Sequence, residues 1–157
     1  MKAAPYFFNT MLGDWNGTCR TWFQPGKLAD ESEISGKIRR VIGGGYLRHE
    51  YSGEIQGKMR HGDEIYLFNT AKNRFEVSWI VSFHMSDAIM LSMGNALPAN
   101  NGFEVVGSYD AGPGNPPWGW KTVYEIIDAG HLKITAFNIT PNGEEAKAGE
   151  IEYKRES

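Results

Sequence analysis

The stretch Phe-Glu-Val-Ser-Trp-Ile-Val-Ser-Phe, residues 75–83, alternates apolar and polar side chains with one interruption, at Ile80. Its apolar positions all have odd numbers: Phe75, Val77, Trp79, Val81 and Phe83. Successive side chains of a strand point to opposite faces, so this pattern predicts a β-strand with one buried face and one face toward water.

Weaker alternation of the same kind runs through most of the remaining chain. It predicts strands over 15–23, 32–42, 46–55, 64–69, 89–95, 103–109, 120–127, 132–139 and 146–154. Turn-forming residues separate these runs, as at Arg60–Asp63, Asn100–Gly102 and Pro141–Gly143. Asn-Gly pairs supply the positive φ angles that hairpin turns require. A short helix is predicted over Pro5–Leu12, before the first strand.

About ten antiparallel strands in one open sheet would leave two long exposed edges, and closing the sheet removes both. We therefore predict an all-β fold: an antiparallel up-and-down barrel of about ten strands with a short N-terminal helix, forming one domain over residues 1–157. A sandwich of two sheets is the alternative.

Composition narrows the possible partners of the 157-residue chain. Its 16 Lys and Arg against 19 Asp and Glu give a net charge of −3, which argues against a nucleic-acid partner. No apolar run approaches the ~20 residues that span a bilayer, so no membrane partner is expected. The single cysteine, Cys19, fits a reducing compartment, and we expect a cytoplasmic protein of bacterial type.

Several aromatic and polar side chains are candidates for lining the barrel. If Trp15 points inward, alternation also places Cys19, Thr21 and Phe23 inward, and it places His49 and Tyr51 on one shared face. The candidate ligand-binding residues are His49, Tyr51, Tyr66, Trp79, Met93, Tyr124 and Tyr153, with Trp120 as a further lining residue. We expect these groups to bind a small, mostly apolar or amphipathic molecule without catalysis.

Three other interpretations remain open. The same residues could simply fill the barrel as core, or Tyr, His and Glu groups could make it an isomerase or hydratase. His49 and Tyr51, about 7 Å apart on one strand face, are the best-placed acid–base pair. The aromatic loop Pro116–Trp120 is a candidate contact in a homodimer or a cover for the barrel mouth. The four histidines lack the spacing of a zinc site, and we expect neither metal nor cofactor.

The segment Leu-Gly-Asp-Trp-Asn-Gly, residues 12–17, resembles the Gly-x-Trp signature of lipocalin-like (calycin) barrels. The resemblance implies that Trp15 closes one barrel end and that a basic residue from the far end of the chain, Arg155, packs over its ring. Loose motifs along nearly the whole chain resemble a bacterial family of unknown function with this barrel type. They include residues 44–47, 50–53, 122–125 and 141–145.

More distantly, the chain is similar to nitrobindin, a ten-stranded barrel that binds haem through a late histidine. That resemblance implies haem or nitric oxide binding. The last predicted strand here, within 144–154, contains no histidine, and His131 is the nearest candidate.

Overall fold

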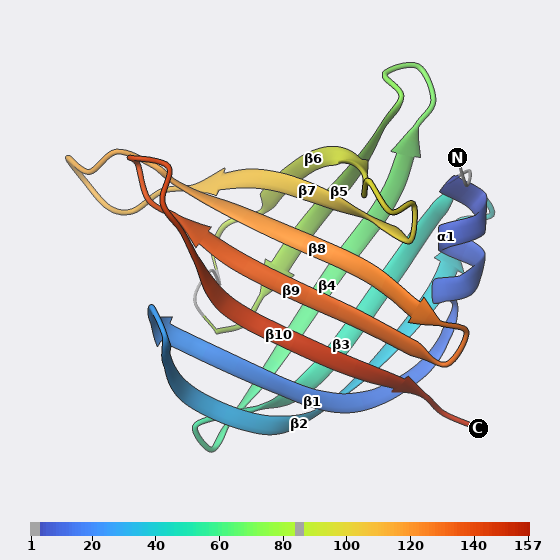
Figure 1. Ribbon diagram of the computed structural model, residues 1–157, viewed down its shortest axis with the longest axis horizontal. Coiled ribbons are helices and arrows are strands. Elements are labelled where there is room, and N and C mark those ends of the chain that lie inside the picture. The colour runs from blue at the N-terminus through green and yellow to red at the C-terminus, as the bar shows by residue number, and fades with distance from the viewer. Residues whose placement is uncertain (1–3, 84–86) are drawn as a thin grey trace.

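Ten antiparallel strands close into one barrel in the computed structural model, which describes residues 4–83 and 87–157 (Figure 1). Each strand pairs with its neighbours in the chain, and β1 also pairs with β10, which closes the sheet. The strands are β1 Gly13–Gln24, β2 Lys27–Val41, β3 Tyr46–Ile55, β4 Lys58–Asn69, β5 Arg74–Val81, β6 Met90–Ala96, β7 Gly102–Tyr109, β8 Trp118–Asp128, β9 His131–Ile139 and β10 Glu145–Arg155. The predicted fold class is confirmed, since the sheet is a closed barrel and not a sandwich.

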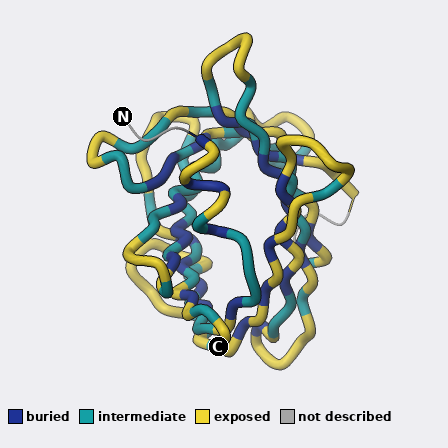
Figure 2. Tube along the Cα trace, turned by 90° about the vertical axis from the view of Figure 1, so that its right-hand side faces the viewer, coloured by how far each residue is buried: buried dark blue, intermediate teal, exposed yellow. Residues whose placement is uncertain are grey.

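One end of the barrel is closed by the helix α1, Ala4–Met11, which lies against this end in Figure 1 and faces the viewer in Figure 2. Its buried face carries Phe7, Phe8 and Met11, which belong to the hydrophobic core. The rings of Phe7 and Phe8 each lie about 6.0 Å from the ring of Phe75 on β5. The helix is held because this apolar face is buried, since eight residues form a marginal helix by themselves.

Contacts of Trp15 and Arg155 hold the first and last strands together at the same end of the barrel. The two residues face each other across β1 and β10, and the guanidinium carbon lies 4.3 Å from the indole ring. Trp15 Nε1 donates a hydrogen bond to the carbonyl of Met11 at 2.9 Å, and Arg155 donates to the carbonyls of Thr10 and Leu12. Arg155 therefore packs over the Trp15 ring at this end of the barrel.

One predicted turn is wrong. Arg60–Asp63 is not a turn but lies inside β4, and the hairpin turns earlier, at Gln56 and Gly57, which both have positive φ. Phe23, near the end of β1, is 44% exposed, and its ring stacks on that of Phe83 with centroids 6.2 Å apart. In the described residues, no helix has the length and apolar character needed to cross a membrane.

Candidate functional site

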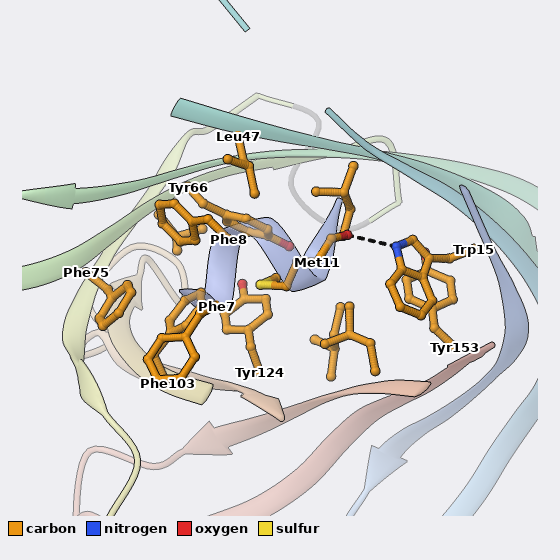
Figure 3. Close-up of a cluster of buried hydrophobic side chains, with 14 of the residues drawn as sticks. Phe7, Phe8, Met11, Trp15, Leu47, Tyr66, Phe75, Phe103, Tyr124 and Tyr153 are labelled. Atoms are coloured by element: carbon orange, nitrogen blue, oxygen red, sulfur yellow. Dashed lines mark hydrogen bonds between the residues drawn. The ribbon is translucent and has the colours of Figure 1, made fainter. Parts of the chain in front are cut away.

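The half of the interior next to α1 is packed solid with aromatic rings (Figure 3). Phe103 on β7 lies between Phe75 and Tyr124, with ring centroids 4.3 and 4.7 Å away, and both pairs are stacked. Phe103 and Tyr66 are fully buried, and their rings meet edge to face. This half, here called the closed half, is therefore a core of mutually packed aromatic rings.

A buried carboxylate lies at the inner surface of this core. Glu64 on β4 accepts hydrogen bonds from the hydroxyls of Tyr66 and Tyr124, at 2.8 and 2.5 Å, and lies 2.8 Å from His49 Nδ1. These donors come from β3, β4 and β8. Three donors around one carboxylate supply the hydrogen bonds that a buried charge needs.

His49 extends this network to the last strand. Its Nε2 lies 2.9 Å from the hydroxyl of Tyr153 on β10. With its proton on Nδ1, the imidazole donates to Glu64 and accepts from Tyr153, so that both ring nitrogens have a partner. Glu64, His49 and Tyr153 therefore form a continuous hydrogen-bonded line across the barrel.

The tyrosines of the network are held in their protonated form. Burial raises the pKa of Tyr66, Tyr124 and Tyr153 well above its usual value, and the charge of Glu64 raises each further. Burial also raises the pKa of Tyr51, the ring of which stacks on His49 at 4.8 Å. At neutral pH these hydroxyls are hydrogen-bond donors, as the geometry around Glu64 requires.

Two inward-facing glycines make room for the network. A Cβ at Gly36 would collide with the Tyr153 hydroxyl, and a Cβ at Gly62 would collide with the ring of Tyr51. Both glycines lie inside strands, where glycine is otherwise unfavourable. The hydroxyl ends of Tyr51 and Tyr153 therefore lie directly over these glycines.

The half away from α1, here called the open half, is lined by side chains that keep part of their surface exposed. Trp79 on β5 and Trp120 on β8 point inward and stack at 5.5 Å, yet neither is buried. Trp79 Nε1 donates to the hydroxyl of Tyr51 at 2.8 Å, and Tyr109 donates to Asn138 at 2.5 Å. Polar groups with fixed orientations thus lie among exposed aromatic faces, a composition typical of small-molecule sites.

The predicted lining residues are therefore divided between the two halves. His49, Tyr66, Tyr124 and Tyr153 belong to the buried network, whereas Trp79 lies in the open half and Tyr51 joins the two. Whether they bind a ligand stays a prediction.

Met93 does not line the interior, and its placement there is wrong. It is 40% exposed on the outer face of β6, because the inward positions of that strand are Met90 and Ser92.

Glu64 and Arg60 are among the interior residues that the sequence analysis did not single out. Alternation backward from Tyr66 reaches Glu64, Gly62 and Arg60 on one face, so the signal was present. It was obscured because Gly62-Asp63 resembles a turn.

No histidine among the described residues offers a free nitrogen to the interior. Both nitrogens of His49 are hydrogen-bonded, while His61 and His131 are exposed on the outer face, and His84 lies outside the described residues. Placed in this way, His49 and His131 do not fit an axial ligand for haem inside the barrel. The described residues also contain no group of three or more His, Cys, Asp or Glu suited to a metal ion.

A groove of about 1010 Å³ crosses the outer face of β1 to β5. Most of its lining side chains point away from the interior, among them Lys37, Glu50, His61 and Asp63. Most of its lining residues are polar or charged, and Tyr51 is among them.

The sequence profile of the family described as "Protein of unknown function (DUF1579)" matches residues 4–155. A search of curated protein sequences finds no match. Among solved structures, the S-type phycobiliprotein lyase from Guillardia theta covers 99% of this chain and 94% of its own, with 10% identity and a TM-score of 0.63. A DUF3598 protein of unknown function from Nostoc punctiforme covers 99% of this chain and 100% of its own, with 9% identity and a TM-score of 0.29. The first likeness shows a shared fold.

Proposed function

The chain belongs to this family of proteins of unknown function, and we propose that it binds a small, mostly apolar or amphipathic molecule in the open half of the barrel. The observation that carries the proposal is the exposure of Trp79 and Trp120, two large inward-facing rings that stack on each other and leave other surface uncovered. A ligand that covers these rings removes their exposed apolar surface from water, and this burial favours binding.

The closed half supports this proposal by holding the site in shape. Tyr51 lies between the halves, with its ring stacked on His49 and its hydroxyl bonded to Trp79. In this proposal Tyr51 and Trp79 touch the ligand, whereas Tyr66, Tyr124 and Tyr153 position them from behind. A rigid supporting network lowers the ordering cost of binding.

Native mass spectrometry of freshly purified, untagged protein tests the proposal. We expect a mass above that of the chain, lost on denaturation, and we expect the neutral dye phenylnaphthylamine to bind the emptied protein and quench tryptophan fluorescence. Replacing both Trp79 and Trp120 by Ala should abolish this quenching and dye binding.

The matched control replaces Leu91 and Met93, two exposed apolar residues on the outer face of β6, by Ala. It should bind the dye as the unaltered protein does. An emptied protein that binds neither the dye nor mixed lipids would overturn the proposal.

A catalytic role is the second candidate, and the line Glu64–His49–Tyr153 favours it. A carboxylate that orients an imidazole, which in turn contacts a hydroxyl, is an arrangement suited to proton transfer in an isomerase or hydratase. Incubation of the released ligand with the protein distinguishes the classes. A hydratase changes its mass by one water, an isomerase changes its chromatographic retention only, and a binding protein returns it unchanged.

A further inference from the structure

Arg60 projects into the barrel from β4. Its position pairs with Gly53 of β3, which pairs with the buried Ile34 of β2, so all three share the inner face. The guanidinium carbon lies 5.3 Å from the centre of the Tyr51 ring, and Nη2 donates to Cys19 Sγ at 3.5 Å. The cation therefore lies beside the residue that joins the closed half to the open half.

This cation lacks a counter-charge in the described part of the chain. Nε of Arg60 is buried and has no hydrogen-bond partner, and no carboxylate lies within ion-pair distance of the side chain. Four other arginines each have a carboxylate partner: Arg20, Arg39, Arg48 and Arg74. Glu64, the carboxylate of the network, is already occupied by two tyrosines and His49.

An arginine with unsatisfied hydrogen-bond donors and no counter-charge is energetically unfavourable unless another group supplies the acceptors. A guanidinium has five donors, and among the residues 4–83 and 87–157 the only acceptor within hydrogen-bond distance is a sulfur, which is a weak one. The side chain of Arg60 is half-buried, so water reaches only part of the guanidinium, and its buried Nε has no acceptor. The planar fork matches two oxygens of one acid group, which would satisfy both the charge and the free donors.

We infer that the ligand of the open half is an organic anion, with a carboxylate or similar acid group bound to Arg60 and an apolar body against Trp79 and Trp120. The inference rests on the proposed function and specifies its ligand class. Tyr51 connects the two parts of the site, since its ring faces Arg60 and its hydroxyl holds Trp79. The acid group fixes the orientation of the ligand, and the stacked rings supply most of the buried area.

Two dyes that differ by one acid group test this inference. Phenylnaphthylamine is neutral, and anilinonaphthalene sulfonate adds a sulfonate to the same ring system. The unaltered protein should bind the sulfonate at least about tenfold more tightly, the equivalent of one ionic hydrogen-bonded contact. Arg60→Met should remove this preference and leave binding of the neutral dye unchanged.

The matched control is Arg48→Met, which removes an arginine from the outer face of β3, where it pairs with Asp63. It should keep the full preference for the sulfonate. Arg60→Lys keeps the charge without the fork and should retain part of the preference. Should Arg60→Met fail to fold, the preference of the unaltered protein and its partial reduction in Arg60→Lys decide the question, and an Arg60→Lys protein with the full preference would overturn the inference.

The outcomes separate the two proposals. Equal binding of both dyes, unaffected at Arg60, overturns the inference and leaves the proposed function standing. Binding of neither dye overturns both. A sulfonate preference that Arg48→Met abolishes and Arg60→Met leaves intact assigns the anion to the outer surface and also overturns the inference.

Discussion

Phe103 in the closed half and Trp120 in the open half are both inward-facing aromatic residues on neighbouring strands, yet their surroundings differ. Phe103 is enclosed by Phe75 and Tyr124 and has no exposed surface. Trp120 stacks on Trp79 and meets Tyr109 edge to face, but it keeps part of its surface exposed. The same residue class therefore serves as core at one end and as available binding surface at the other.

The difference comes from what closes each end. The helix α1 delivers Phe7, Phe8 and Met11 into the closed half, and the described residues place no helix at the other end. A ten-stranded barrel is wider than its own side chains readily fill. The stability of the protein should therefore depend mainly on the closed half, and ligand binding on the open half.

Phe103→Ala should give the largest loss of stability. It removes a fully buried ring from between two stacked neighbours and leaves a cavity in the closed half. We expect the free energy of unfolding to fall by about 3–5 kcal/mol, measured by urea denaturation. A loss below about 1 kcal/mol would mean that the closed half is not the core.

Alkaline pH should unfold the protein through the buried tyrosines. Burial raises the pKa of Tyr66, Tyr124 and Tyr153 in the folded state, so above pH ~10 unfolding releases protons that the native state retains. Stability is complete below that pH and falls as pH rises, by about 1.4 kcal/mol per pH unit for each tyrosine.

Urea titrations at several alkaline pH values measure this slope. Tyr66→Phe should reduce it by the share of one tyrosine, whereas Tyr109→Phe, in the open half, should change it less. Equal changes for the two variants would remove the distinction between the halves.

Glu64→Gln should have an intermediate effect. An amide has two donor hydrogens where the carboxylate accepted from Tyr66, Tyr124 and His49, so at least one donor then faces another donor. The free energy of unfolding should fall by about 1–3 kcal/mol.

Glu50→Gln is the matched control, because the side chain of Glu50 is exposed on the outer face of β3. It should change stability by less than about 0.5 kcal/mol. Equal effects of the two substitutions would show that Glu64 is not the centre of the network.

Trp120→Ala should have the smallest effect on stability and a large effect on binding. Loss of the stacking with Trp79 should cost about 0.5–1.5 kcal/mol in urea denaturation. The affinity for phenylnaphthylamine should fall severalfold in the same sample. A loss of stability as large as that of Phe103→Ala would show that the open half is packed core, contrary to the proposed function.

Much of this structure follows from the sequence by itself, because alternation is a local property. The run at 75–83 predicts an inward face with Phe75, Val77 and Trp79, and the structure places these three side chains there. Strand alternation also places Tyr66, Tyr124 and Tyr153 inside. The number of strands and the need to remove two sheet edges are enough to predict a closed barrel.

β6 shows where local alternation fails. Its inner face carries Ser92 and Gly94 between Met90 and Ala96, while its outer face carries Leu91 and Met93, so the middle of the strand presents its larger apolar side chains outward. A Cβ at Gly94 would collide with the backbone of Glu104 on the adjacent strand β7, so no larger residue fits there. How closely an adjacent strand approaches cannot be predicted from the sequence of β6 alone.

Only the tertiary structure decided which inward residues meet. His49 and Tyr153 are 104 positions apart in the chain, and Glu64 and Tyr124 are 60 apart, yet each pair is hydrogen-bonded. Such contacts depend on the register of β10 against β1 and on the closure of the whole sheet. The sequence by itself determined the barrel and most of its inward residues, because strand alternation is local. The joining of Glu64, His49 and three tyrosines, and the unpaired charge of Arg60, were decided when closure brought distant strands together.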